Sequence, residues 1–302
     1  MSDATPNSYT PEDVTQAFNE ISATLFADKL AEATPKLLIT AGLQSSGKTY
    51  LLEKSLLPSG RYANYVRLYL PEYRQKHPQY AEMEKHGVLH TYEHTEAFVR
   101  EVSGKIFTQA FKQKYNIIME CAFDSLDFAG FMPMAQAAGY QFDVHIVACN
   151  QVFAHVSSIK RALKSLKNGE LERFVQSSEL ESSRNNAQVI IEALESAAKT
   201  TKGSKITLYE RGFGKLKERT LRAQSLYTEA PNGTPNTSTT TAFFSYGAYE
   251  KIISHQICTR EERFDVVKEC HLALLKTGVQ ASNVPDRIYN ELYAYIITYM
   301  CR

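Results

Sequence analysis

Residues 37–49 read Leu-Leu-Ile-Thr-Ala-Gly-Leu-Gln-Ser-Ser-Gly-Lys-Thr, so an apolar run leads directly into the pattern G-x-x-x-x-G-K-T. This pattern is typical of a phosphate-binding loop that follows a buried strand and opens a helix. Gly42 and Gly47 let the backbone turn so that its N–H groups point at phosphate oxygens. Lys48 has the reach to contact the β- and γ-phosphates, and the hydroxyl of Thr49 is a ligand for Mg²⁺. The stretch therefore predicts binding of a nucleoside triphosphate, ATP, together with Mg²⁺.

The residues around the loop complete the predicted cofactor site. Residues 50–54 are compatible with a helix whose positive N-terminal end faces the bound anion. The predicted ATP-binding residues are Gly42, Gln44, Ser45, Ser46, Gly47, Lys48 and Thr49, and Thr49 is also the predicted metal ligand. The loop alone does not distinguish water, a small molecule or a macromolecule as the phosphoryl acceptor.

The composition narrows the class of protein. The chain has 302 residues, of which 43% are hydrophobic, which predicts one large domain or one domain with an appendage. Its 34 basic residues nearly balance 33 acidic ones, so the net charge gives no indication of nucleic-acid or membrane binding. The sequence shows no run of the roughly 20 apolar residues that span a bilayer and no signal-peptide pattern. Five scattered cysteines without metal-type spacing fit the reducing cytoplasm, where ATP is plentiful.

Apolar strand patterns alternate with helical patterns after the loop. This alternation predicts an α/β fold with a mostly parallel sheet covered by helices on both faces. Strands are expected at residues 37–41, 65–70, 116–120, 144–148 and 205–209, and a turn at 211–214; helices are expected at 11–34, 93–114, 131–138 and in 150–200. Composition divides the chain into a core at 1–228, a linker or mobile loop at 229–242 and a helical C-terminal appendage at 243–302.

Charged residues at the expected strand ends are the candidates for chemistry. Glu120 ends an apolar strand, where parallel α/β sheets bind ligands, and it could bind Mg²⁺ through water or contact an acceptor hydroxyl. Asp124 and Asp127 lie in the loop that follows. Arg161 and Arg173 could bind phosphate, although each arginine taken alone is typical of a protein surface.

A basic segment follows the second expected strand. It reads Glu72-Tyr73-Arg74-Gln75-Lys76-His77-Pro78. Glu72 and Arg74 are the titratable groups nearest the strand end. From the residues alone, a histidine that packs or bonds locally is the simpler interpretation of His77.

Taken in order, these segments resemble the zeta toxins of bacterial toxin–antitoxin systems. The resemblance rests on the phosphate-binding loop, the His77-Pro78 segment, the strand at 115–120, the Ile-x-Arg helix at 159–161, Arg173, and residues 208–216. It covers roughly residues 36–220. Zeta toxins are P-loop kinases that phosphorylate the sugar of UDP-N-acetylglucosamine and so block cell-wall synthesis. The resemblance therefore implies a P-loop kinase-like fold and a sugar-nucleotide substrate.

The resemblance also assigns roles to individual residues. Lys48 and Thr49 would hold ATP and Mg²⁺, and Arg161 and Arg173 would clamp the phosphates during catalysis. The predicted substrate-binding residues are Arg74, His77, Glu120 and Asp124. The resemblance further implies a small helical antitoxin that blocks the ATP site.

Two departures from the family pattern lie on the acceptor side. The family carries its catalytic base, an aspartate, six residues before the histidine, where this chain has Pro71. Glu72 follows it and is the predicted base, provided that the turn at Pro71 re-aims its side chain. The family also tends to have Gly-Thr after the strand-end glutamate, where this chain has Cys121-Ala122. A different acceptor, such as NAD or a polynucleotide end, and a silenced ATP-binding regulatory module therefore stay open as alternatives.

Overall fold

Strands β1 to β5 form the parallel part of one sheet, and the phosphate-binding loop follows its central strand. The computed structural model describes residues 8–68, 70–170, 172–212, 218–228, 235–236, 241–280 and 284–300. Within these residues, seven strands pair in the order β2-β3-β1-β4-β5-β6-β7. The parallel strands are β1 (Lys36–Ala41), β2 (Tyr65–Arg67), β3 (Asn116–Cys121), β4 (Gln141–Ala148) and β5 (Lys205–Arg211). β1 lies between β3 and β4, so the three carboxyl ends meet beside the loop.

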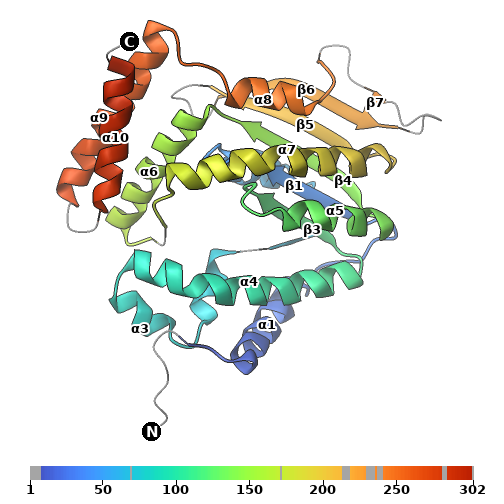
Figure 1. Cartoon of the computed structure of the whole chain (residues 1–302). Helices are drawn as coiled ribbons and strands as arrows, with labels where there is room; N and C mark the ends of the chain where they lie inside the picture. Colours follow the sequence, from blue (N-terminus) through green and yellow to red (C-terminus); the bar gives the residue numbers. More distant parts are fainter. Residues whose placement is uncertain are drawn as a thin grey trace.

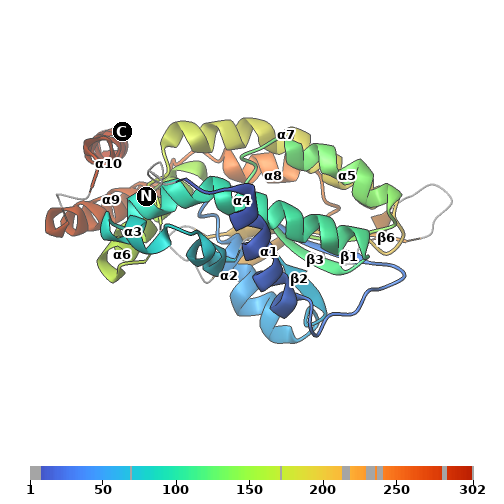
Figure 2. The ribbon, with the colours of Figure 1, turned by 90° about the horizontal axis from the view of Figure 1, so that it is seen from below.

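The sheet buries both faces, and alternate residues of β1 show how. Leu37, Ile39 and Ala41 belong to the large core cluster, to which helices on one face contribute, whereas Leu38 packs in a smaller cluster on the other face. The larger face is covered by α1 (Pro11–Leu25), α4 (Val88–Lys112), α5 (Asp127–Ala137), α7 (Ser177–Lys199) and α8 (Tyr246–Ile253) (Figures 1 and 2). The smaller face is covered by the segment after the loop, α2 (Lys48–Leu51), η1 (Leu52–Leu56) and η2 (Leu57–Ser59).

Local chemistry explains where several elements begin and end. α1 starts at Pro11 because Thr10 and Asp13 form a reciprocal capping box, and it ends at Leu25, well before the expected residue 34. The second strand is shorter than expected: β2 ends at Arg67, and a 3₁₀ helix, η3 (Pro71–Lys76), begins a few residues later. α3 (Tyr80–Lys85) then leads into α4. The expected turn at 211–214 lies largely outside the described residues.

The edge of the sheet beyond β5 was not anticipated from the sequence. β6 (Arg219–Tyr227) pairs antiparallel with β5, and β7 (Pro235–Asn236) pairs antiparallel with β6. β6 buries only Ala223, Ser225 and Tyr227, and its remaining residues are polar or exposed. This weak alternation hides the strand from a reading of the sequence. The expected linker at 229–242 falls mostly outside the described residues.

The described C-terminal residues are helical, as predicted, and pack in two places. α8 places Tyr249 and Ile253 in the large core cluster. α9 (Arg260–Val279) and α10 (Asp286–Met300) lie side by side and pack on α6 (Gln151–Asn168) through a separate apolar cluster (Figures 1 and 2). No helix in the described part of the chain has the length and apolar character needed to cross a lipid bilayer.

Candidate active site

The loop after β1 has the backbone geometry of a phosphate cradle. Gly42 adopts φ +147°, and a Cβ built there would lie 2.3 Å from the carbonyl oxygen of Val147. Gly47 and Ser45 also have positive φ, at 102° and 61°. Such conformations turn successive N–H groups toward one side of the loop. The two glycines are therefore required by the shape of the loop.

Polar groups around this loop lack protein partners in a way that fits a bound triphosphate. Among the described residues, the buried hydroxyls of Ser45 and Ser46 have no hydrogen-bond partner. Lys48 is buried, and burial lowers the pKa of its ammonium group, although the nearby Glu120 carboxylate opposes the shift. Buried polar groups normally find partners. Phosphate oxygens would supply acceptors for these groups, so the residues present fit ATP.

Thr49 and Glu120 form the part of the site that suits Mg²⁺. The Thr49 hydroxyl donates a hydrogen bond to Glu120 Oε2 at 2.6 Å. Glu120 Oε1 accepts a bond from Arg67 at 3.4 Å, and Arg67 also pairs with Glu53. A carboxylate beside the loop threonine matches the way in which a strand-end acid supports a phosphate-bound metal. In the described residues no group of three or more His, Cys, Asp or Glu side chains could hold a metal ion alone, so Mg²⁺ here would depend on the phosphates.

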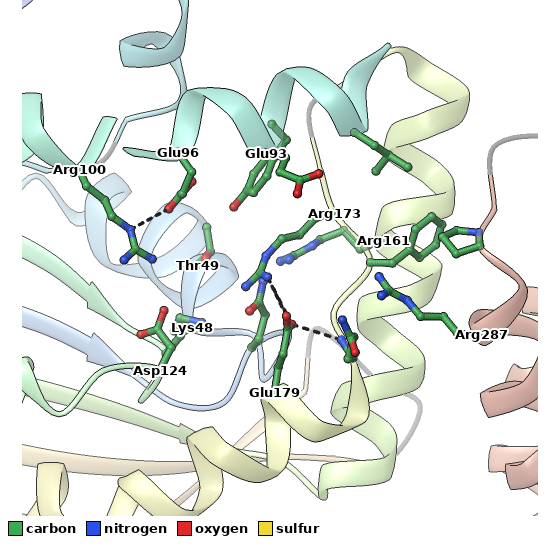
Figure 3. A pocket seen from close by; sticks show the side chains of 17 residues that line it. Lys48, Thr49, Glu93, Glu96, Arg100, Asp124, Arg161, Arg173, Glu179 and Arg287 are labelled. Carbon is green, nitrogen blue, oxygen red and sulfur yellow. Dashed lines mark hydrogen bonds and ion pairs between the residues drawn. The ribbon is translucent and has the colours of Figure 1, made fainter. Parts of the chain in front are cut away.

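Two cavities meet at this loop. The first, which we call the arginine cavity, has a volume of about 700 Å³ and lies beneath α4 (Figure 3). The second, the lysine cavity, has a volume of about 610 Å³. Both are lined by Lys48, Thr49 and Arg161. The arginine cavity is also lined by Gln44, Tyr92, Glu93, Glu96, Arg100, Asp124, Arg173, Phe174, Glu179 and Arg287, and the lysine cavity by Ser45, Gly47, Tyr50, Phe153, Lys160, Lys164, Arg211 and Lys276.

The two predicted phosphate-binding arginines are held by carboxylates. Arg161, on α6, pairs with Glu172 at 2.7 Å between Nε and Oε2. Arg173 pairs with Glu179 at 3.2 Å, and in Figure 3 both guanidinium groups point into the arginine cavity. The carboxylates orient the guanidinium groups while leaving N–H groups to face the cavity. The structure therefore brings Lys48, Thr49, Arg161, Arg173 and Asp124 together around one space.

Arg211 is a residue of this site that the sequence reasoning missed. It lies at the end of β5, where it is buried and donates hydrogen bonds to the carbonyl oxygen of Ser45 at 2.6 Å and to Ser157 Oγ at 3.0 Å. Burial lowers the pKa of its guanidinium group. Arg211 thus supports the phosphate-binding loop from the lysine-cavity side. The strand-end rule that singled out Glu120 would also have found it.

Arg74 and His77 lie outside both cavities and have packing roles. Arg74 is buried and donates to Thr95 Oγ1 at 2.9 Å and to Glu96 Oε2 at 2.5 Å. His77 packs edge-on against Tyr9 and Phe98, with ring centroids 5.5 and 5.0 Å apart, and burial lowers its pKa. These contacts hold η3 and the residue after it against α4 and against Tyr9, which precedes α1. Arg74 reaches the arginine cavity through Glu96 and Tyr92, which both line it.

The structure places the predicted base, Glu72, away from the two cavities, and it separates Asp124 from Asp127. Glu72 is exposed on η3 and lines neither cavity. Asp124 lies beside Lys48 in the arginine cavity (Figure 3), after Phe123, whose φ of +61° turns the chain sharply. Asn186 stabilises this turn by donating to the Phe123 carbonyl oxygen at 3.2 Å. Of Glu72 and Asp124, therefore, only Asp124 lines the arginine cavity. Asp127 begins α5 and lines neither cavity.

Comparison with known proteins agrees with this geometry. The family model described as zeta toxin matches residues 22–220, which is more than half of the chain. The chain belongs to the zeta toxin family. Members of this family are kinases. The match includes the loop, Glu120, Arg161, Arg173 and Arg211, whereas α8, α9 and α10 lie beyond it. No curated protein sequence matches the chain.

Solved structures of similar fold come from toxin–antitoxin and related complexes. A chain from the PezAT chromosomal toxin–antitoxin system of Streptococcus pneumoniae is 14% identical, with a TM-score of 0.61, and the match covers 90% of this chain and 98% of that one. The AvrRxo1-ORF1:AvrRxo1-ORF2 complex with sulphate ions is 11% identical, with a TM-score of 0.53, covering 95% and 82%. The same complex with ATP is 9% identical, with a TM-score of 0.50, covering 94% and 86%. At these identities the likeness shows the fold.

Proposed function

We propose that this zeta toxin family member transfers the γ-phosphoryl group of ATP to a sugar hydroxyl of a sugar nucleotide, UDP-N-acetylglucosamine, and acts as a toxin. The observation that supports this most strongly is that two cavities share Lys48, Thr49 and Arg161. A kinase needs one space for the nucleotide and one for the acceptor, with the transferring group where they meet. In this proposal the lysine cavity takes ATP and the arginine cavity takes the acceptor.

The side chains at the junction of the two cavities, and those beside it, have roles in the proposed transfer. Lys48 and the loop N–H groups bind the β- and γ-phosphates, and Arg161 and Arg173 stabilise the charge that spreads over the phosphoryl oxygens. Thr49, with Glu120 behind it, would hold Mg²⁺, which when bound would neutralise charge on the β- and γ-phosphates. The ATP-bound structure of the AvrRxo1 complex, which has a similar fold, is consistent with ATP as the donor.

We propose that Asp124, and not Glu72, is the general base that removes the proton from the acceptor hydroxyl. Asp124 lines the acceptor cavity beside Lys48, and a general base must lie within hydrogen-bond reach of the hydroxyl it deprotonates. Changing Asp124 to Asn should lower kcat by roughly 10²–10⁴-fold. The matched change Glu72→Gln should leave kcat within about twofold. If the two results were exchanged, Glu72 would be the base.

The proposal also includes a partner and a location. The PezAT and AvrRxo1 structures come from a toxin–antitoxin system and a two-protein complex. We therefore propose that a small antitoxin protein restrains this chain. We place its action in the cytoplasm, where ATP is available and where the described cysteines, which are all free, would stay reduced.

The test is an acceptor assay read by product mass. Purified protein is incubated with ATP, Mg²⁺ and UDP-N-acetylglucosamine, and Lys48→Ala serves as the control. The expected product carries one additional phosphate and is absent from the control. A product with NAD or a polynucleotide in place of the sugar nucleotide would keep the kinase and change the acceptor.

A silenced ATP-binding module is the second candidate, and one observation favours it. Pro71 stands where the family has its aspartate, and the neighbouring Glu72 does not face the acceptor cavity. This candidate predicts ATP binding that depends on Lys48, with no phosphorylated product from any acceptor tested. Measuring ATP binding in the same preparation as the transfer assay distinguishes it from an inactive or misfolded sample.

A further inference from the structure

The arginine cavity, which we propose binds the acceptor, is also lined by an arginine from outside the residues that the family model matches. Arg287 lies in the first turn of α10 and lines the arginine cavity together with Pro285. Its guanidinium group points into the cavity toward Arg161 and Arg173 (Figure 3). The family match ends at residue 220, so α10 adds a wall to this cavity that the family pattern does not include.

Arg287 also differs from the other arginines of the cavity in its charge environment. Arg100 pairs with Glu96 at 3.4 Å, Arg161 with Glu172, and Arg173 with Glu179. Arg287 has no ion-pair or hydrogen-bond partner among the described residues of the chain. A guanidinium group that faces a cavity without a carboxylate offers its N–H donors to an anion, and phosphate geometry suits it best.

The position of Arg287 is fixed by the packing of α10. Ile288, Leu292 and Ile296 lie on one face of the helix and are buried against α6 and α9. The hydroxyl of Tyr295 lies 2.8 Å from Nδ1 of His155, and the backbone N–H of Ser177 donates to Glu291 at 3.3 Å. The helix that carries Arg287 is therefore anchored to α6, which carries Arg161, and to α7, which begins a few residues after Arg173. A side chain on such a support contributes binding energy with little ordering of the backbone.

The cavity has two distinct ends. In Figure 3, Lys48 and Asp124 lie at one end, where the phosphoryl group and the acceptor hydroxyl would meet, and Arg287 lies at the other. Tyr92 and Phe174 also line the cavity. A volume of about 700 Å³ is that of a site for a molecule larger than a simple sugar. An acceptor that reaches both ends would carry a hydroxyl at one and an anionic group at the other.

We infer that the C-terminal helices complete the acceptor pocket and that Arg287 binds a phosphate or diphosphate group of the acceptor. This inference rests on the proposed function, because it assigns the arginine cavity to the acceptor. It gives residues 284–300 a role in substrate selection: a nucleotide-linked sugar binds, and the free sugar does not. Arg287 is a specificity residue here, and the catalytic groups remain at the other end of the cavity.

The first experiment measures binding in the absence of transfer. A non-hydrolysable ATP analogue and Mg²⁺ saturate the ATP site, and UDP, UMP and uridine are then titrated by calorimetry. We expect Arg287→Ala to raise the Kd of UDP by roughly 10- to 100-fold, because charge-assisted hydrogen bonds are lost. Uridine should bind weakly and equally to both proteins. A difference between UDP and UMP shows which phosphate Arg287 contacts.

Arg260→Ala is the matched control, because Arg260 is exposed at the start of α9 and lines neither cavity. It should bind UDP as the unchanged protein does. Arg287 is itself exposed, so its removal should leave the melting temperature and the affinity for the ATP analogue unchanged. Unaltered UDP binding in Arg287→Ala would overturn the inference. So would a failure of the unchanged protein to bind UDP while it binds the analogue.

A second measurement separates this inference from the proposed function. If UDP-N-acetylglucosamine is the acceptor, Arg287→Ala should raise its KM by a similar factor while kcat and the KM for ATP stay close to their original values. A protein that binds UDP through Arg287 but transfers no phosphate would refute the proposed reaction and leave the anion site in place. A fall in kcat with unchanged KM would instead show that Arg287 does not act through binding.

Discussion

The phosphate-binding loop has no room for a side chain at position 42. A Cβ at Gly42 would lie 2.3 Å from the Val147 carbonyl oxygen and 2.6 Å from Ser46 Oγ, whereas ordinary contacts begin at 3.4 Å. Gly42→Ala therefore forces the loop away from β4 by about 1 Å, and its φ of +147° adds strain of about 1–3 kcal/mol. Losing one charge-assisted hydrogen bond to phosphate, about 1.5–3 kcal/mol, should raise the Kd of ATP roughly 10- to 150-fold.

Equilibrium titration with a fluorescent ATP analogue measures this loss directly. Two other glycines separate the steric effect from the conformational one. Gly60 has a positive φ of 72° and open space around the added Cβ. Gly60→Ala therefore introduces backbone strain without a steric clash and without moving the phosphate-binding loop. Gly104→Ala, inside α4, carries neither. Both controls should bind ATP normally. A Gly42→Ala protein that is folded and binds ATP within twofold of the original value would refute the argument that this loop shape holds the phosphates.

Three further changes test the charges of the site and one buried histidine. Glu120→Gln keeps a hydrogen-bond partner for Thr49 but removes the negative charge. The Mg²⁺ concentration needed for half-maximal ATP binding should therefore rise about tenfold. An unchanged Mg²⁺ dependence would exclude Glu120 from the metal site. Glu179→Gln frees Arg173 from its ion pair and should tighten ATP binding by less than about fivefold, since such exposed pairs are weak; weaker binding would contradict this. Burial lowers the pKa of His155 below its usual 6.5, so the unfolded chain binds the proton more readily, and the free energy of unfolding should fall as the pH drops below 6.5. His155→Gln should flatten that dependence in urea unfolding curves measured between pH 7 and 5; an equal slope would refute it.

Much of the fold follows from local patterns that carry their own chemistry. β1, β3, β4 and β5 appear at the expected places because parallel strands buried on both faces leave continuous apolar runs. The loop after β1 is recognisable because only particular residues allow its shape. β6 was missed because an edge strand needs few apolar residues. The C-terminal end of α1 and the start of α5 differ from the expected residues because helix ends leave only a weak signal in the apolar pattern.

The residues around the phosphate-binding loop were predicted more completely than the rest of the arginine cavity, for a physical reason. Lys48, Thr49 and Glu120 lie on or beside adjacent strands, whose order the βα pattern implies. The arginine cavity instead combines α4, α6, the segment before α7, and α10, which are distant in sequence. Helix packing alone brings Glu93, Arg173 and Arg287 together, and no local pattern encodes that packing. Asp124 was found because it follows a strand end.

Arg74 and His77 bear on how related sequences should be interpreted. Both belong to the segment by which the family is recognised, yet here they tie η3 to the helices beside it. Natural selection for a folded chain would retain them even in a descendant that had lost phosphoryl transfer. On this reasoning the segment reports the architecture of the chain, and its presence alone does not indicate phosphoryl transfer. Under the proposed mechanism, a carboxylate at the position of Asp124 is the better indicator of an active kinase.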